Sequence, residues 1–456
     1  MLWTGAARRA TALPPCGGAA RGLWVAAGAV RAVCSPAEGW SGVASSEASS
    51  AEAGPGGRGT FLFLQGPVTP FFAEVADALE RAGHRCLRVN LCFGDWLFWR
   101  RPGALNFRGR RESWPAFVSD LLDREGVTDL VLLGEQRFYH KVAIAAAKAR
   151  GVRVTVTDFG YLRPDWITLE PDGMSADSRF PRDPEAVLEL GRRAPEPDLQ
   201  PRYKDSFVTQ ACWDILYHIS SSLLFFLYPG YRSHQVHHPA LVYVGTGLHF
   251  LRTRYNGPRA DRLIAALATL RVPYYVFPLQ METDFQLRAY SPFNDLKTPI
   301  HKVIRSFAEH APKDTMLVIK VHPLDPGLRN WARIVRRSAR RWGVPERVRF
   351  VDGGSLVLLL EGARGVVTVN STVGLWALRA SHPVITLGAA VFDIDGLTFQ
   401  GPLDRFWAEA EPPRPELRDA FVRAIASEIQ IRGVYYRREG RQAAVAAAAQ
   451  RLQAWA

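Results

Sequence analysis

The sequence predicts an α/β protein with two Rossmann-type domains, each built on a parallel sheet, because strand and helix patterns alternate in two separate series. The first series opens at Thr60, where the apolar run FLFL ends in a glycine turn and the helical pattern Phe71–Ala82 follows. The second series is expected to start with a strand, LVYVG, near Leu241 and to continue through a helix at Arg259–Leu270. Such alternation indicates sheets that are covered by helices on both faces.

The remaining elements divide the chain into domains. Two α/β series of similar length are typical of the GT-B arrangement, in which two Rossmann-type domains face a central cleft. We expect an N-terminal domain over 59–235, a C-terminal domain over 236–435 and a closing helix over 436–456 that crosses back to the first domain. The other expected strands are 87–92, 129–134 and 152–158 in the first series, and 274–279, 316–322, 348–353, 365–370 and 383–388 in the second, with a further helix at 142–151.

Residues 1–58 differ in composition from the rest of the chain. They are rich in Ala, Gly and Ser and include the low-complexity run SSEASSAEAGPGG, which cannot bury a core. The short apolar stretch that precedes this run is interrupted by Arg31, which argues against a cleaved export signal. We therefore expect a disordered leader, and a reading frame that starts further along the chain is the alternative.

Composition limits the class of protein. Of 456 residues, 47% are hydrophobic and 22% charged, which is typical of a soluble globular protein and excludes collagen-like, wholly disordered and polytopic membrane classes. The net charge of +13 favours anionic partners, namely nucleic acid, an anionic membrane surface or phosphorylated small molecules. Nucleic acid is disfavoured because the basic residues are dispersed and no binding module is recognised.

Several cofactor and metal classes lose their support. The five cysteines show no CxxC spacing, so neither a disulfide framework nor a cysteine metal site is expected, and a reducing cytoplasm is the simplest compartment. No GxGxxG, GxxxxGK[ST] or HExxH motif occurs, which removes the main signals for nicotinamide, P-loop and zincin chemistry. His234, His237 and His238 have no carboxylate framework beside them, so we expect no metal site there.

Two motifs of the second series suggest an anion site. Lys320 and His322 end one strand and share a face, so both can point at one anion beyond the sheet edge. Asn370, Ser371 and Thr372 join the next strand but one to a helix, whose first backbone N–H groups are free to bind an anion. The alternatives are a solvated strand end and plain N-capping. Together the motifs describe a phosphate site that needs no metal.

Carboxylates and arginines follow two strands of the first series. Glu135 and Arg137 come after one strand, and Asp158, Arg163 and Asp165 come after the next. A carboxylate at a strand end can act as a nucleophile or as an acid or base, and arginine can hold an anion bidentately. Helix capping and ion pairing are the structural alternatives. Contacts to a base or sugar are also suggested at two further strand ends, by Gln65 with Gly66 and by Gln280.

Three stretches suggest contact with a membrane. The apolar segment Trp213–Tyr228 is too short to span a bilayer and reads either as a buried helix or as an interfacial one. Arg333, Arg336, Arg337, Arg340 and Arg341 share a broad helical face, and Trp96, Phe98 and Trp99 stand beside Arg100 and Arg101. Basic and aromatic patches of this kind suit anionic lipid surfaces, although a solvated basic face is common.

A series of motifs resembles a known family. The stretches FLQGPVTPFFAEVADALERAGH, NLCFGDWLFW, GEQRFYH, DFGYLRPDWITLE, PLQMETDFQLRAYSPF, KVHPLD and NSTVG are similar, in this order, to the capsular polysaccharide β-Kdo transferase family in its single-module form. The resemblance runs from about 61 to 397 and beyond. It implies a GT-B-like fold and transfer of 3-deoxy-D-manno-oct-2-ulosonic acid (Kdo) from CMP-β-Kdo, with retention at the anomeric carbon and without a cofactor.

The same resemblance implies the acceptor and the place of action. A phosphatidylglycerol-type lipid receives the first β-Kdo at the inner face of the inner membrane, where the protein is peripheral and cytoplasmic. This step begins the oligo-Kdo linker of a capsular polysaccharide, with other capsule assembly proteins as partners. An anionic lipid acceptor accounts for the basic and aromatic patches.

The resemblance also assigns roles to residues. Asp158 is the expected nucleophile, although related modules read EDGFxR where this chain has Phe159 in the second acidic position, so Glu135 or Asp165 is the alternative. His322 is expected to hold or protonate the phosphate leaving group. Binding of CMP-Kdo is assigned to Lys320, His322, Asn370, Ser371, Thr372, Gln280, Arg137 and Arg163, and the acceptor side to Gln65, Gly66 and Asp165.

Two other functions stay open from the sequence. One is a different CMP-sugar or nucleotide-sugar transferase of GT-B shape. The other is a non-catalytic capsule assembly or export factor that binds glycolipid through the same fold. Turnover of CMP-Kdo with release of CMP distinguishes a β-Kdo transferase from both of these functions.

Overall fold

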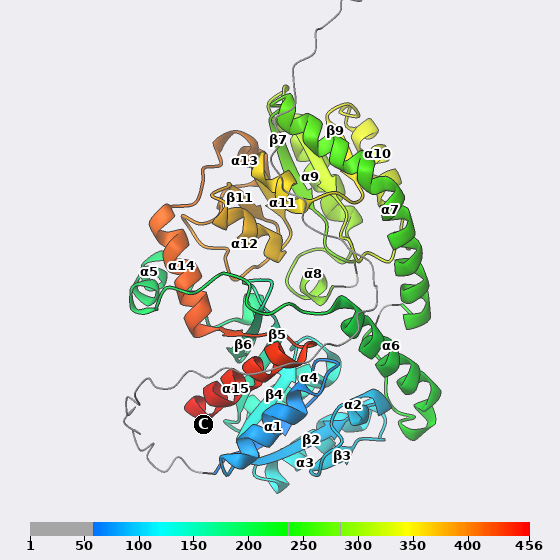
Figure 1. Ribbon diagram of the computed structural model, residues 1–456, viewed down its shortest axis with the longest axis vertical. Coiled ribbons are helices and arrows are strands. Elements are labelled where there is room, and N and C mark those ends of the chain that lie inside the picture. Colours follow the sequence, from blue (N-terminus) through cyan, green and yellow to red (C-terminus); the bar gives the residue numbers. More distant parts are fainter. Residues whose placement is uncertain (1–57, 236, 283) are drawn as a thin grey trace, which may run out of the picture. The chain divides into compact units, whose positions relative to one another are not determined.

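The computed structural model describes residues 58–456 apart from residues 236 and 283. The leader expected at 1–58 therefore lies outside the described residues, except for its last position. The described chain is an α/β protein with one seven-stranded and one five-stranded sheet, which confirms the predicted fold class (Figure 1). The described residues belong to one compact unit, so the domain boundary near residue 235 stays a prediction.

The first sheet has the strand order β12-β6-β5-β4-β1-β2-β3. Its strands β1 to β5 are parallel, and β1 is buried on both faces, as expected of a central parallel strand. The elements up to the second sheet are β1 (Thr60–Phe63), α1 (Phe71–Arg81), β2 (Arg85–Asn90), α2 (Phe93–Leu97), β3 (Ala104–Asn106), the 3₁₀ turn η1 (Arg111–Ser113), α3 (Trp114–Arg124), β4 (Asp129–Leu133), α4 (Phe138–Lys148), β5 (Arg153–Phe159), β6 (Trp166–Pro171), η2 (Ser175–Asp177), α5 (Pro184–Arg193), α6 (Phe207–Leu223), η3 (Phe225–Leu227) and α7 (Pro239–Thr269).

The first sheet is not wholly parallel, contrary to the sequence prediction. The chain after β5 turns back as β6, which pairs antiparallel with β5 from Phe159–Ile167 to Thr155–Pro171. The turn is tight at Gly160, whose N–H donates to Trp166 O at 2.9 Å. A Cβ at this position would lie 2.3 Å from that oxygen, so only glycine fits. The DFGYLRPDW motif is therefore a β-hairpin.

The second sheet is parallel throughout, with the strand order β11-β10-β7-β8-β9. Its strands fall where the sequence predicts them from residue 274 onward. The elements are β7 (Tyr274–Pro278), α8 (Phe285–Ala289), α9 (Lys297–His310), β8 (Met316–Lys320), α10 (Trp331–Arg341), β9 (Val348–Val351), α11 (Leu356–Glu361), β10 (Ala363–Thr368), α12 (Thr372–Arg379), β11 (Val384–Thr386), α13 (Leu403–Glu409), α14 (Pro415–Glu428), β12 (Gln430–Arg432) and α15 (Arg438–Trp455).

The strand predicted near Leu241 is wrong, because LVYVG lies inside the long helix α7. Pro239 occupies the first turn of this helix, and the His238 side chain accepts a hydrogen bond from Ala240 N at 3.3 Å. A five-residue apolar run has no periodicity that separates a strand from a helix segment. The run is also half-exposed, which a central parallel strand would not be.

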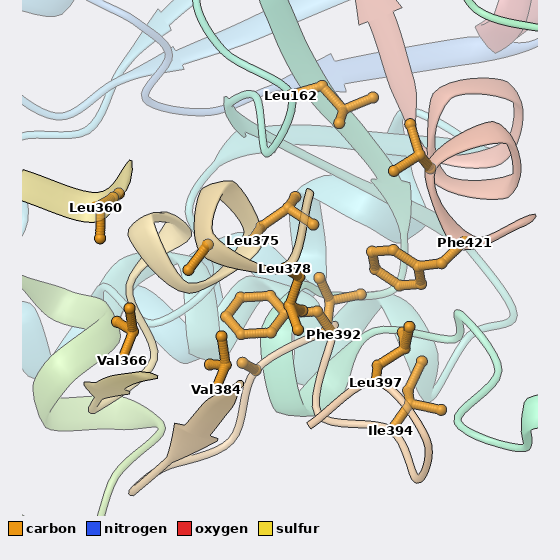
Figure 2. Close-up of a cluster of buried hydrophobic side chains, with 14 of the residues drawn as sticks. Leu162, Leu360, Val366, Leu375, Leu378, Val384, Phe392, Ile394, Leu397 and Phe421 are labelled. Carbon is orange, nitrogen blue, oxygen red and sulfur yellow. The ribbon is translucent and has the colours of Figure 1, made fainter. Parts of the chain in front are cut away.

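One hydrophobic core joins the β5–β6 hairpin to the second sheet. Leu162 of the hairpin, Phe421 of α14 and Val366 of β10 belong to the same buried cluster (Figure 2). Side chains of α5 enter this cluster as well. Phe180, which precedes α5, meets Phe421 edge to face at 5.6 Å between ring centroids. The burial of this cluster fixes the hairpin, and hence the strand end at Asp158, against the second sheet.

The C-terminal segment returns to the first sheet, as the sequence predicts for its last helix. Strand β12 pairs antiparallel with β6, and α15 shares a buried cluster with α1 (Figure 1). Arg441 of α15 forms two hydrogen bonds to Glu74 of α1, at 2.9 and 3.0 Å. The connecting residue Tyr435 therefore lies beside the end of β5.

Candidate active site

Three predicted site residues stand at the carboxyl ends of neighbouring strands in the first sheet. Gln65, Glu135 and Asp158 follow or end β1, β4 and β5, which are adjacent in the sheet. The backbone keeps these ends level, because Leu133 N donates to Gln65 O at 2.9 Å and Gly134 N donates to Thr157 O at 3.1 Å. This is the edge at which open α/β sheets bind their ligands.

Glu135 is a buried carboxyl group. Its Oε1 accepts hydrogen bonds from Met174 N, at 3.2 Å, and from the Tyr290 hydroxyl. Burial raises the pKa of Glu135 to about 7, because the charged form loses its hydration. A carboxyl group of this pKa can take up or release a proton near neutral pH.

Asp158 is half-buried, and its pKa is raised to about 6, chiefly by burial. The nearby Asp284 raises this pKa further, whereas the hydrogen bond from Phe159 N to Oδ1, at 2.7 Å, lowers it. The backbone is supported by Tyr435, whose hydroxyl donates to Asp158 O at 3.2 Å. At neutral pH the group is therefore an anion that is weakly solvated and held in place.

Lys320 and His322 lie at the corresponding edge of the second sheet. Lys320 is buried and its Nζ donates to Gly353 O, while burial lowers the pKa of its ammonium group. His322 Nδ1 accepts a hydrogen bond from Leu324 N at 3.1 Å, so the proton of the neutral ring is on Nε2. Burial, and next Arg163, lower the pKa of His322 to about 4. At neutral pH the ring thus offers one N–H donor to a phosphate oxygen.

The residues between β10 and α12 are held by polar contacts within the chain. Gln280 Nε2 donates to Asn370 Oδ1 at 2.8 Å, and Asn370 N donates to Gln280 Oε1 at 3.4 Å. Ser371 is the N-cap of α12, since its Oγ accepts from Val373 N at 3.3 Å. Ser371 thus caps the helix, as the structural alternative expected. Capping leaves the hydroxyl proton of Ser371 available, and the start of a helix such as α12 favours an anion.

The two sheet edges meet at Tyr290. The hydroxyl of Tyr290 contacts Glu135, accepts from Gln136 Nε2 at 2.8 Å and lies 3.1 Å from Asp177 Oδ2. The backbone oxygen of the same residue accepts from Asn370 Nδ2 at 3.4 Å. Tyr290 therefore joins the predicted carboxylate Glu135 of the first sheet to Asn370, a predicted anion-binding residue of the second.

Asp165 lies apart from this site. It is 0% exposed, accepts from Arg202 N at 2.7 Å and from Tyr203 N at 3.0 Å, and forms an ion pair with Arg432 at 3.0 Å. These donors fix the hairpin to the C-terminal segment. A structural role therefore accounts for Asp165, whose carboxylate already has these partners.

Gln65 and Gly66 also have structural partners. Gln65 Nε2 donates to Asp95 Oδ2 at 3.1 Å and to the Tyr217 hydroxyl at 3.0 Å. A Cβ at Gly66 would lie 2.4 Å from the ring of Phe72, so glycine is needed there for packing. Their part in binding an acceptor stays a prediction.

Sequence reasoning missed three residues of the site. Tyr290 lies inside the quoted stretch 278–293, but an isolated tyrosine carries no catalytic signal. Asp177 lies in a 3₁₀ turn after β6 and has no motif around it. Tyr435 is 277 positions from Asp158 in the chain, and only the return of the C-terminal segment brings them together.

The described residues contain neither a clustered metal site nor a membrane-spanning helix. Between residues 58 and 456, apart from the two gaps, no group of three or more His, Cys, Asp and Glu side chains is arranged to hold a metal ion. In the same part of the chain, every helix is too short or too polar to cross a membrane.

Comparison with known proteins places the chain in a family. The family model described as capsule polysaccharide biosynthesis protein matches residues 128–436. The capsule polysaccharide export protein KpsS of Escherichia coli is 33% identical over 82% of this chain and 96% of its own length. The capsule polysaccharide modification protein LipB of Neisseria meningitidis serogroup A is 32% identical over 82% of this chain and 91% of its own. The chain belongs to the capsule polysaccharide biosynthesis protein family and is KpsS-like.

Among solved structures, the chain is similar to the β-Kdo 2,7 transferase of Thermosulfurimonas dismutans KpsC. The two are 14% identical, with a TM-score of 0.40, over 86% of this chain and 99% of that one.

Proposed function

We propose that the protein is a retaining β-Kdo glycosyltransferase. It moves Kdo from CMP-β-Kdo to a phosphatidylglycerol-type lipid and so starts the oligo-Kdo linker of a capsular polysaccharide. The motif resemblance, membership of the capsule family and the chemistry of the candidate site support this proposal. The protein acts at the cytoplasmic face of the inner membrane, together with other capsule assembly proteins.

The observation that carries the proposal is the pairing of two chemistries at one place. Glu135 and Asp158 supply carboxyl groups with raised pKa values, and Lys320 and His322 supply donors for a phosphate. The charge of Arg163 lowers the pKa of both His322 and Asp158, which supports one site for the two sets. CMP-Kdo presents a phosphodiester and a carboxylate to such a site, and a single phosphate needs no bridging metal.

The first step forms a covalent adduct. An oxygen of the Asp158 carboxylate attacks the anomeric carbon of Kdo, and the bond from that carbon to the phosphate oxygen breaks. CMP leaves with the bonding electron pair. His322 Nε2–H donates to the leaving phosphate, while Lys320 and the start of α12 at Thr372 stabilise its charge. Arg137 and Arg163 hold the sugar carboxylate.

The second step restores the configuration. A hydroxyl group of the acceptor attacks the anomeric carbon from the opposite face, and the Asp158 carboxylate leaves. Glu135 accepts the hydroxyl proton, which its pKa of about 7 permits at neutral pH. Two inversions give net retention. Overall, CMP-Kdo and the acceptor alcohol give Kdo-lipid, CMP and a proton.

Product analysis tests this function. The protein is incubated with CMP-Kdo and phosphatidylglycerol vesicles, and released CMP and Kdo-lipid are measured. We expect a β-linked product, and Asp158→Asn should lower its formation by ~10³-fold or more. Asp419→Asn, which removes a carboxylate from the surface of α14, serves as the matched control and should retain turnover.

Other outcomes would select the alternatives. Transfer from a different CMP-sugar but not from CMP-Kdo would make the protein another transferase of this fold. Binding of glycolipid without CMP release from any lipid would leave the non-catalytic assembly factor. Equal turnover by Asp158→Asn and the unmodified protein would remove Asp158 from the mechanism.

A further inference from the structure

A cavity of about 530 Å³ has a basic lining that includes Gln136 and Arg137, the two residues that follow Glu135. Its wall comes from the β1 end, from the start of α4 and from the loop that joins η3 to α7. We call it the basic cavity. Its lining residues that matter here are Arg111, Arg137, Lys141, Arg232, Gln136 and Tyr231.

The charges of this cavity are not neutralised by the chain. Across residues 58–456, excluding the two undescribed positions, Arg111, Arg137, Lys141 and Arg232 form no ion pair with a carboxylate. Arg111 instead lies over the ring of Phe138, at 3.6 Å from its centroid. The helix α4 also begins at this wall and adds the positive end of its dipole. A cluster of uncompensated cations around a concave site favours an anionic ligand.

The cavity adjoins the reacting groups. Gln136 and Arg137 directly follow Glu135 in the chain, and the charge of Arg137 also lowers the pKa of Asp158. A phosphate held by Arg111, Lys141 and Arg232 would direct an alcohol attached to it past Arg137 toward Glu135 and Asp158. This is the position that the acceptor of the second displacement needs.

One wall of the cavity is the loop between the helices α6 and α7. Tyr139 holds this loop, since its hydroxyl donates to Gly230 O at 3.5 Å and accepts from Arg232 N at 3.2 Å. A Cβ at Gly230 would lie 1.9 Å from Gly109 O, so the loop is seated closely. The helix α6 reaches the cavity too, through the hydrogen bond between Tyr217 and Gln65.

Both helices expose apolar stripes. On α7 the outward residues recur every three or four positions, whereas Gly245, His249 and Ile264 face inward. None of the α6 side chains is fully buried. Leu251 of α7 is 69% exposed, and Phe225 of the turn η3 is 67% exposed. We call the following set the apolar face: Val208, Ile215, Leu216, Ile219, Leu223, Phe225, Phe226, Leu241, Val244, Leu248, Leu251 and Tyr255.

The two stripes lie on one side of the helix pair. The helices run antiparallel, because Phe207 meets Phe250, at 5.7 Å between ring centroids, and Tyr243 donates to Asp214 at 2.6 Å. Viewed from its N-terminus, each helix carries its apolar stripe on the same rotational side of the residues that contact the other helix. In an antiparallel pair such offsets place both stripes on the same side.

We propose that the apolar face lies on an anionic phospholipid bilayer and that the basic cavity takes the phosphate headgroup of one lipid from it, so that the headgroup alcohol is presented to Glu135 and Asp158. This inference rests on the proposed function and names the acceptor site. A bilayer fits the face better than a second copy of the chain, because exposed cations, Arg254 and Arg259, border it. A third cation, Arg232, lines the cavity and belongs to the segment that joins α6 to α7.

Vesicle binding in the absence of any sugar donor tests the inference. The probes are vesicles of phosphatidylcholine with and without phosphatidylglycerol, and binding is measured by co-sedimentation. We expect the pair Arg111→Gln and Lys141→Gln to weaken binding to anionic vesicles by roughly tenfold or more. The matched control, Arg336→Gln with Arg337→Gln on α10, removes the same charge from an exposed helix and should bind like the unmodified protein.

A second variant tests the face separately. Leu248→Ser with Leu251→Ser alters exposed side chains, so the fold is expected to persist, and vesicle binding should fall even at high salt. Soluble glycerophosphoglycerol should bind this variant as it binds the unmodified protein, and should bind the cavity variant weakly.

Three results would overturn the inference. They are unchanged vesicle binding by the cavity variant, loss of binding by the α10 control instead, and conversion of a dimer to a monomer by the face variant without any effect on vesicles. Because no donor sugar is present, these outcomes are independent of whether the protein transfers Kdo.

Discussion

At the scale of single residues, burial rather than any charged neighbour sets the chemistry of the two candidate carboxylates. Burial is the first cause of the raised pKa of both Glu135 and Asp158. Their values, about 7 and about 6, differ in the order that the mechanism needs, since the nucleophile is ionised before the base. His322, with a pKa of about 4, stays neutral over the same range.

The rate of transfer should therefore fall as the pH is lowered. Both carboxylates must be ionised, so kcat/KM is expected to decline through about pH 7 and more steeply below about pH 6. Glu135→Gln should lower the rate by ~10²-fold and remove the decline in kcat/KM near about pH 7. A profile that is flat between about pH 5 and about pH 8 would contradict these assignments.

Glu170 provides a stability test that is separate from catalysis. This wholly buried residue of β6 accepts hydrogen bonds from Tyr161, at 2.9 Å, and from Ser178, and burial raises its pKa to about 7. Its folded pKa exceeds the unfolded one, so its contribution to stability is full below the unfolded value of 4.5 and is lost as the pH rises through about 7.

Replacing Glu170 by Gln removes this titration. The free energy of unfolding of Glu170→Gln, relative to the unmodified protein, should rise by about 3 kcal/mol between about pH 5 and about pH 8. Urea unfolding at the two pH values measures the difference. Parallel pH dependences of the two proteins would show that Glu170 is ionised in the fold without cost.

The sequence predicts candidate site residues but not the groups that surround them. Glu135, Asp158, Lys320 and His322 were predicted because each follows a recognisable buried strand, and the structure places all of them at sheet edges. Their pKa values depend on burial by segments distant in the chain, which local pattern does not contain. Tyr290 is an example, since its role arises only from contacts across the two sheets.

At the scale of elements, the start of α12 combines a cap with a candidate phosphate contact. Ser371 caps α12, and Ser355 caps α11 in the same way, with Oγ accepting from Leu358 N at 3.3 Å. Each Ser→Ala change should therefore cost about 1 kcal/mol of the free energy of unfolding. Only Ser371→Ala should also raise the KM for CMP-Kdo, by roughly tenfold, because it loses a hydrogen bond to a charged group.

Thermal unfolding and steady-state kinetics on the two variants separate these effects. An equal KM for both variants would leave Ser371 with a purely structural part.

Elements were predictable where periodicity was clear and ambiguous where it was not. The parallel strands from β7 to β11 carry continuous apolar runs bounded by turns and were predicted correctly. The LVYVG run was assigned to a strand because it is short and apolar, yet it continues a helix that begins at Pro239. The β6 strand was missed because a hairpin through Gly160 has no recognised turn dipeptide.

At the scale of the whole molecule, the C-terminal segment links the two sheets. Helix α14 packs with the second sheet, β12 joins the first, and Tyr435 supports the backbone at Asp158. The candidate carboxylates and the side chains proposed to bind the phosphate are therefore held in place by one continuous core and by strand pairing. We expect the donor sugar to bridge the two sheet edges at Asp158 and His322.

The intact mass of the protein after incubation with CMP-Kdo, without an acceptor, tests the central claim most directly. We predict an added mass of one Kdo on the unmodified protein and none on Asp158→Ala, which shows that the sugar is held by that carboxylate. An adduct that persists in Asp158→Ala would move the nucleophile to Glu135. The absence of an adduct, together with no release of CMP when phosphatidylglycerol is supplied, would contradict the transferase account.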